Sequence, residues 1–231
     1  MTNRIVIIAA HSDDAVLSLG GFLNKTKKNI YIINVFSTCA VSIIPGLDNI
    51  KKITDKNNKE EIDFAKKINA SLCFLKHNEV LLRDYKYWSG EIKKPLDNLL
   101  IKEIYKEISD RICVSDEVYF PISIGDHVDH KILFEIGKKL YLKMNDKIKI
   151  FFYEDLPYAK EKSTDLYRNK LTQFKSSKYI DISNEINKKI KMCYLYKTQY
   201  SAPYLNILNE YARDIAPLNN KSKFFERVWT F

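Results

Sequence analysis

A histidine and two aspartates stand together near the start of the chain, at His11, Asp13 and Asp14. Imidazole nitrogen and carboxylate oxygen are ligands of zinc, and a catalytic zinc site keeps one position open for water. His11 and Asp14 are three residues apart, so a helical turn can place both on one side. Asp13 would then point elsewhere and could act as a base on the water. The alternative is that Ser12 or one of the aspartates only caps the following helix.

A second group of histidines, in the segment Gly125 to His130, can supply the third protein ligand that a catalytic zinc site usually has. The chain has four histidines, and three of them fall in these two segments: His11, His127 and His130. The competing explanation is a pair of surface histidines at the start of a helix. Asp129 lies between the two, where it can orient one of them or cap the same helix.

The elements around the two segments explain why the segments should meet. The apolar, β-branched run Ile5 to Ala10 ends directly before His11 and predicts a buried strand. The run Glu117 to Phe120 predicts another strand shortly before the second segment, and a helical pattern follows each segment. Ligands of open α/β sheets bind at the carboxyl ends of strands, so we expect both segments at one edge of one sheet.

The chain alternates strand and helix patterns, which is typical of right-handed βαβ units and a parallel sheet. Strands are expected over residues 4–10, 30–36, 72–75, 117–120, 148–153 and 179–182. Helices are expected after the first strand to about residue 27 and over residues 59–69, 95–112, 131–142 and 184–199. We therefore predict a Rossmann-like, three-layer α/β fold with a mainly parallel sheet and helices on both faces, in one domain spanning residues 1–231.

Two stretches without regular periodicity are expected near the site. Thr38 to Asn58 contains Pro45 and Gly46 and follows the second strand, so we expect a mobile loop at the rim. Arg83 and Asp84 follow the third strand and are candidates for substrate contact. The tyrosines of the last third of the chain suit either sugar stacking or core packing, and core packing is favoured. They are Tyr194, Tyr196, Tyr200, Tyr204 and Tyr211.

The composition limits the classes of protein that fit. With 231 residues, 45% of them hydrophobic, the chain can build a full α/β core and is not a disordered protein. The net charge of +9 comes from dispersed lysines, so no nucleic-acid partner is expected, and a phosphate-bearing substrate is a lesser alternative. No GxGxxG follows the first strand, which argues against a dinucleotide site. Four cysteines without a CxxC pair, and no run long enough to span a membrane, favour a cytoplasmic protein.

The opening segment and the distant histidines together resemble a known family. A strand ending in His-x-Asp-Asp, a following Gly-Gly and a distant His-x-x-His are similar to the zinc-dependent N-deacetylases of the PIG-L/LmbE type. The family commonly has Ala-His-Pro-Asp-Asp-Glu, whereas this chain has Ser12 and Ala15 in place of the proline and the glutamate. The resemblance implies that His11, Asp14 and His130 carry zinc.

The resemblance also implies the remaining roles. Asp13 would be the base, and His127 would lie near the reacting carbonyl, where it stabilises the oxyanion if it is protonated. Family members remove acetyl from N-acetylglucosaminyl groups, so the expected partner is an amino-sugar substrate on a small molecule or glycoconjugate. One zinc ion per chain is the expected cofactor, although another divalent metal would also suit these ligands.

Two other functions stay open at this point. One is a different metal-dependent amide or ester hydrolase on the same scaffold, because a fold does not determine a function. The other is a non-catalytic protein that binds glycan or nucleic acid. The identity of the sugar, the aglycone and the oligomeric state do not follow from the sequence.

Overall fold

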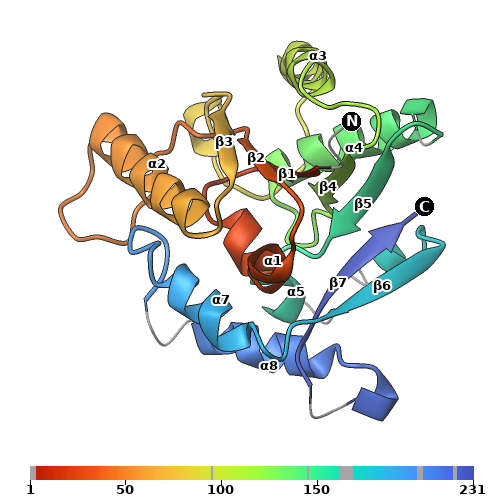
Figure 1. The fold of residues 1–231 in the computed structure, drawn as a ribbon. Helices are drawn as coiled ribbons and strands as arrows, with labels where there is room; N and C mark the ends of the chain where they lie inside the picture. The colour runs from red at the N-terminus through yellow and green to blue at the C-terminus, as the bar shows by residue number, and fades with distance from the viewer. Residues whose placement is uncertain (1–3, 95, 145, 162–168, 202–204, 221–222) are drawn as a thin grey trace.

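The centre of the molecule is a mixed sheet of seven strands, in the order β3-β2-β1-β4-β5-β7-β6 (Figure 1). The computed structural model describes residues 4–94, 96–144, 146–161, 169–201, 205–220 and 223–231. Neighbouring strands from β3 to β5 are parallel, β7 runs antiparallel to β5, and β6 runs antiparallel to β7. The strands are β1 Ile5–Ala9, β2 Ile30–Asn34, β3 Ser71–Phe74, β4 Glu117–Pro121, β5 Lys149–Tyr153, β6 Ser176–Asp181 and β7 Phe225–Thr230. The predicted mainly parallel α/β fold is confirmed.

Helices cover both faces of this sheet (Figure 1). The chain moves from β1 through α1 to β2 in one direction along the sheet, and from β4 through α4 to β5 in the other. Because such crossovers are right-handed, α1 and α4 lie on opposite faces. The helices are α1 Asp14–Lys25, α2 Ile50–Lys67, α3 Leu96–Ser109, α4 Val128–Met144, α5 Tyr158–Glu161, α7 Ile186–Cys193 and α8 Asn206–Asp214. None of the helices in the described ranges is long and apolar enough to cross a membrane.

The reversal of direction makes the β1/β4 boundary the switch point of the sheet. β1 pairs with β2 on one side and with β4 on the other, and all five of its residues are buried. Helices lie on both faces of the sheet, which explains why the sequence of this buried central strand is a continuous apolar run instead of an alternating one. The crevice beyond the carboxyl ends of β1 and β4 is where open α/β sheets bind ligands.

The structure corrects the expected loop Thr38–Asn58 and the expected helix over residues 59–69. α2 already begins at Ile50, and the Asn49 side chain accepts a hydrogen bond from the Lys52 amide as its N-cap. The apolar periodicity of this helix is hidden because half of its buried face is polar. The buried residues are Ile53, Asn57, Glu60, Glu61, Phe64 and Ala65.

The last third of the chain departs most from the expected elements. The helix expected over residues 184–199 ends at Cys193, and α8 and β7 do not follow from the sequence pattern. β7 takes its place between β5 and β6 through antiparallel pairing, which local periodicity does not reveal. Tyr204 lies outside the described residues.

Candidate active site

The two histidine segments meet at the switch point of the sheet. His11 lies two residues beyond the end of β1, and α1 begins three residues later at Asp14. α4 begins at Val128, earlier than expected, so that His130 lies in its first turn. Asp13 occupies the N-cap position of α1, but its side chain makes no capping hydrogen bond. The capping explanation therefore does not account for Asp13.

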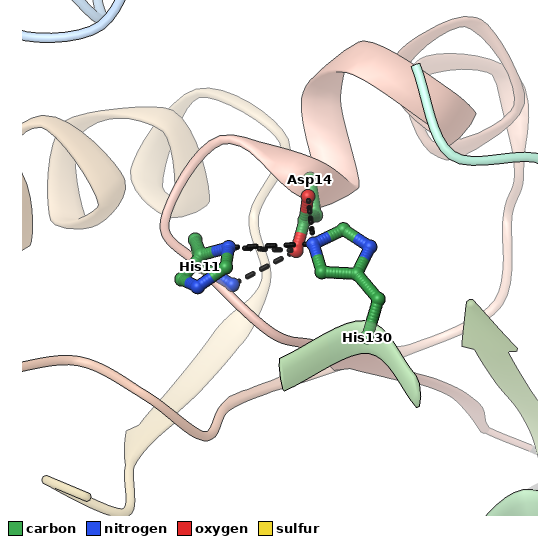
Figure 2. A group of neighbouring side chains, drawn as sticks. All are labelled: His11, Asp14 and His130. Carbon is green, nitrogen blue, oxygen red and sulfur yellow. Dashed lines mark hydrogen bonds and ion pairs between the residues drawn. The ribbon is translucent and has the colours of Figure 1, made fainter. Parts of the chain in front are cut away.

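Three potential ligand atoms converge there, and Figure 2 shows the three side chains facing one another. His11 Nδ1 lies 3.3 Å from His130 Nε2, and Asp14 contributes one oxygen 3.5 Å from His130 Nε2 and the other 3.9 Å from His11 Nδ1. Two ligands of a tetrahedral zinc ion, each bound at roughly 2.0–2.1 Å, lie about 3.3–3.4 Å apart. The side chains therefore fit a His₂Asp metal site, and the three residues form one of the clusters able to hold an ion.

A buried carboxylate stands behind each of these two imidazole rings. His11 Nε2 lies 3.0 Å from Asp129 Oδ2, and His130 Nδ1 lies 2.6 Å from Asp155 Oδ1. Both aspartates are at most 1% exposed. Such a carboxylate accepts a hydrogen bond from the N–H on the far side of the ring, so that the lone pair of the other nitrogen faces the centre. Sequence reasoning missed Asp155, although it stands at the carboxyl end of β5 on the same edge of the sheet.

Asp129 is expected to orient His127 or His130, but its carboxylate contacts His11 instead. Its other oxygen accepts a hydrogen bond of 2.7 Å from Arg83 Nη2, and Val80 donates its amide to Oδ2 at 3.0 Å. Burial raises the pKa of Asp129, but the hydrogen bond and charge of His11 outweigh it and hold this pKa below its ordinary value. Asp129 is therefore a charged anchor shared by several elements around the site.

Arg83 and Asp84, the candidates for substrate contact, do not line the cavity of the site. Arg83 is engaged with Asp129 and donates from Nη1 to the carbonyl of Asn78 at 2.7 Å. Asp84 is exposed, and its carbonyl accepts a hydrogen bond from Lys93. The structure thus places Arg83 behind the site and Asp84 on the surface.

The charges around His11 stabilise a cation at this position. Burial lowers the pKa of His11, but the hydrogen bond with Asp129 and the charge of Asp14 raise it to about 9. His130 behaves similarly, since Asp14 and Asp155 outweigh burial and raise its pKa. An arrangement of carboxylates that favours positive charge suits a divalent ion.

His127 has a different environment from the other two histidines. Its Nδ1 accepts the amide of Asp129 at 3.2 Å, which leaves Nε2 as the nitrogen that carries the proton. Burial, followed by the neighbouring charges of His11 and His130, lowers the pKa of His127 well below its ordinary value. The lowered pKa favours the neutral imidazole over the protonated form on which the expected oxyanion role is conditional, and the neutral ring can still donate one hydrogen bond from Nε2.

Asp13 lines the same cavity and has one partner that sequence reasoning missed. Tyr200 donates its hydroxyl to Asp13 Oδ2, although the sequence analysis favours packing for this tyrosine. Burial and the charge of Asp14 raise the pKa of Asp13, and the hydrogen bond from Tyr200 opposes this shift. Tyr200 lies in the segment after α7, and no local sequence pattern indicates that this segment contacts the site.

The cavity is lined by the polar residues of the site and by aromatic side chains. Its volume is ≈ 230 Å³, well above the roughly 30 Å³ of one water molecule. Trp88 stacks on Tyr158 with ring centroids 5.5 Å apart, and on His127 also at 5.5 Å. Cys39, Val41 and Asn57 complete part of the rim, so residues of the Thr38–Asn58 stretch do border the site. The lining residues that the structure describes include no lysine or arginine.

Comparison with known proteins gives matches among solved structures. No protein-family model and no curated protein matches the sequence. A zinc-inhibited form of a teicoplanin deacetylase has a TM-score of 0.76 at 20% identity, over 98% of this chain and 97% of that chain. N,N'-diacetylchitobiose deacetylase from Pyrococcus horikoshii has a TM-score of 0.61 at 15% identity, over 98% and 82%.

An enzyme of another class also shares the architecture. The 4-carboxy-2-hydroxymuconate hydratase from Pseudomonas putida has a TM-score of 0.61 at 16% identity, over 99% of this chain and 95% of that chain. At these identities the likeness establishes the fold alone. Because deacetylases and a hydratase share it, the activity must be argued from the side chains of the site.

Proposed function

We propose that the protein is a metal-dependent N-deacetylase that hydrolyses the acetamide of an N-acetylated amino sugar. The observation that carries this proposal is the convergence of His11, Asp14 and His130, each imidazole backed by a buried carboxylate, with Asp13 beside them. Two imidazole nitrogens and one carboxylate oxygen are a usual set of three protein ligands for a hydrolytic zinc site, whose fourth position is open to water. Zinc is the proposed ion, and another divalent metal would use the same atoms.

The chemistry divides among the residues of the cavity. A zinc ion held by His11, Asp14 and His130 would supply Lewis acidity toward the acyl oxygen and the attacking water. Asp13 removes the proton of that water as it attacks the acyl carbon, and later returns the proton to the nitrogen of the departing amine. His127 donates its Nε2 proton as a hydrogen bond to the oxyanion, as a neutral imidazole.

The walls of the cavity favour a neutral, hydroxyl-rich substrate. Trp88 and Tyr158 offer aromatic faces, which suit the apolar face of a sugar ring. Because no lysine or arginine stands among the described lining residues, a substrate with several carboxylates would have only the metal ion as a counter-charge there. The similarity in fold to two deacetylases, one of them acting on N,N'-diacetylchitobiose, supports the same class.

The test is the release of primary amine from a panel of N-acetylglucosaminyl compounds. We expect turnover by the full chain that a chelator abolishes and that added zinc or another divalent metal restores. His130→Ala should lose both metal and turnover. His77→Ala is the matched control, because His77 pairs with Glu107 at 2.7 Å and does not line the cavity. Turnover that resists chelation, or a metal-loaded protein that releases amine from no compound, would overturn the proposal.

A further inference from the structure

A second cavity, of ≈ 400 Å³, lies beside α4 and is separate from the candidate active site. Four lysines and two glutamates line it, and none of its lining residues borders the first cavity. Three of its walls are α4, the turn after β4 and the segment around Glu91. The charged residues of the lining are Lys94, Lys131, Lys138, Lys170, Glu91 and Glu135.

Ser123 forms part of this cavity and has an unsatisfied hydroxyl. The residue is 1% exposed, and its Oγ has no hydrogen-bond partner. Buried hydroxyls in native proteins nearly always have a partner, so an unsatisfied one indicates a bound group or water. The carbonyl of the same residue accepts a hydrogen bond from Lys170, which places an ammonium group beside it.

The positive charges of the cavity are incompletely neutralised. Lys131 pairs with Glu91 at 3.0 Å, but that glutamate side chain is 94% exposed, so solvent screens the pair. Lys94 and Glu135 are 3.9 Å apart, at the limit of an ion pair. Lys138 lies 4.6 Å above the Phe134 ring, and no described carboxylate forms an ion pair with it. Lys170 is 3.1 Å from Asp126 Oδ1, which also lies 3.6 Å from Lys131.

We propose that this cavity binds a phosphate-type anion. A cavity lined by four lysines and by Ser123, whose hydroxyl has no partner, matches a multiply charged oxyanion, which lysines bind as point charges. A bound anion would also replace Glu91 and the Gly90 carbonyl, which is 2.9 Å away, as partners of the Lys131 ammonium group. The phosphate is either free or part of the substrate, and the second source rests on the proposed deacetylase function.

The second cavity could bind the phosphate group of a phosphorylated sugar whose acetamide lies in the first cavity. The described lining of that cavity has carboxylates but no lysine or arginine, and its histidines are assigned to the metal and the oxyanion, so an anionic group of the substrate would be bound better outside it. The segment from Trp88 to Gly90 links the two cavities. Trp88 borders the first, and the Gly90 amide donates to the carbonyl of Asp126 at 3.3 Å beside the second.

The binding test is a calorimetric titration of the full chain with inorganic pyrophosphate and with inorganic phosphate. We expect saturable binding that weakens by about tenfold or more in Lys138→Gln, weakens in Ser123→Ala, and falls with added salt. Lys139→Gln is the control, because this neighbouring lysine lies 4.6 Å from the Tyr105 ring and is not part of the lining. His130→Ala should bind as the unaltered chain does, which separates this site from the metal centre.

Two results would overturn the proposal. One is the absence of saturable binding. The other is equal weakening in Lys138→Gln and Lys139→Gln, which would show only the diffuse effect of the net charge. The source of the phosphate follows from the KM of N-acetylglucosamine and its 1-phosphate: a KM advantage of the phosphate ester that Lys138→Gln removes assigns the site to substrate. Equal KM values with retained pyrophosphate binding assign it to a free anion.

Discussion

Each imidazole nitrogen that faces the centre is held in place by a carboxylate on the other side of its ring. Asp129 serves His11, and Asp155 serves His130 while also accepting the amide of Ile124 at 2.9 Å. Buried carboxylates are costly unless they are bonded in this way. The pairing therefore indicates that the ring orientations are built into the fold.

Asp13 and Asp14 should differ when each is replaced by alanine. Asp14 converges with His11 and His130, whereas Asp13 faces the cavity and bonds Tyr200. Asp13→Ala should keep the metal and lose roughly 10²–10⁴-fold in turnover, the usual effect of removing a general base. Asp14→Ala should lose metal affinity and recover in part with excess zinc. Metal content and kcat of the two variants decide the assignment, and equal metal loss in both would contradict it.

Asp155→Asn should weaken metal binding without removing a proposed ligand. The amide oxygen of asparagine is a neutral and weaker acceptor for His130 Nδ1–H than the carboxylate, so the ring is held less firmly and its Nε2 is less basic. A loss of roughly 10–100-fold in metal affinity is expected for such a change. Asp116→Asn is the control, since this buried aspartate bonds Arg4 and the Cys113 amide near the opposite end of β4. Competition with a chromogenic chelator measures the affinity, and an unchanged value would contradict this role.

At the scale of elements, α1 needs small residues where another segment packs closely against it. A Cβ on Gly21 would lie 2.7 Å from Cβ and Cγ2 of Ile182, which follows β6. Glu226 of β7 accepts the amides of Gly21 and Phe22 at 2.9 and 2.8 Å and binds the buried Lys189 of α7 at 2.7 Å. The glycine thus lets α1 approach the antiparallel part of the sheet.

Gly21→Ala should destabilise the protein because the new methyl group overlaps a branched side chain. Overpacking of this kind typically costs about 1–3 kcal/mol, against a gain of roughly 1 kcal/mol from the higher helix propensity of alanine. Gly20→Ala should cost less, since its Cβ would come no closer than 3.1 Å to Lys189 Cγ and 3.3 Å to Val16 Cγ2. Urea unfolding measures both, and a larger loss for Gly20→Ala would contradict the packing argument.

At the scale of the whole molecule, polar contacts join the last third of the chain to the first. Glu60 accepts the Thr198 hydroxyl at 2.5 Å, and Glu61 accepts the Tyr196 hydroxyl, also at 2.5 Å. These contacts anchor the segment that carries Tyr200 to Asp13. One of the two carboxyl groups in these contacts, that of Glu61, is completely inaccessible to solvent.

The stability of the molecule should depend on pH through Glu61. Burial raises its folded-state pKa well above the ordinary value of 4.5, so the stability that protonated Glu61 contributes is complete below about 4.5 and is lost as the pH rises through the folded pKa. Glu61→Gln cannot ionise and escapes this loss. Relative to the unaltered chain, the variant should gain free energy of unfolding as the pH rises above about 4.5, by at most roughly 1.4 kcal/mol per pH unit, and the gain should level off above the raised pKa of Glu61. Denaturant unfolding of the exposed control Glu103→Gln should show no such trend, and a constant difference for Glu61→Gln would contradict it.

The sequence by itself determined the α/β class and predicted that His11 and Asp14 meet the segment Gly125 to His130, whereas the choice of His130 within that segment came from the family resemblance. β1 is a continuous buried apolar run, and both histidine segments come within a few residues of the end of a strand, so the local pattern was sufficient to place them at one edge of the sheet. Where a buried helix face is polar, as in α2, the same reasoning failed. Periodicity detects only apolar burial, and Glu60 and Glu61 are buried through partners distant in sequence.

Only the tertiary structure decided which carboxylate supports which histidine and which aromatic residues enter the cavity. Asp155 is 25 residues from His130, and Tyr200 is 187 residues from Asp13. Such pairings depend on strand order and on the antiparallel insertion of β7, which are set by non-local packing. A sequence pattern records the environment of each residue along one element, whereas partner choice across elements arises only when the sheet is assembled.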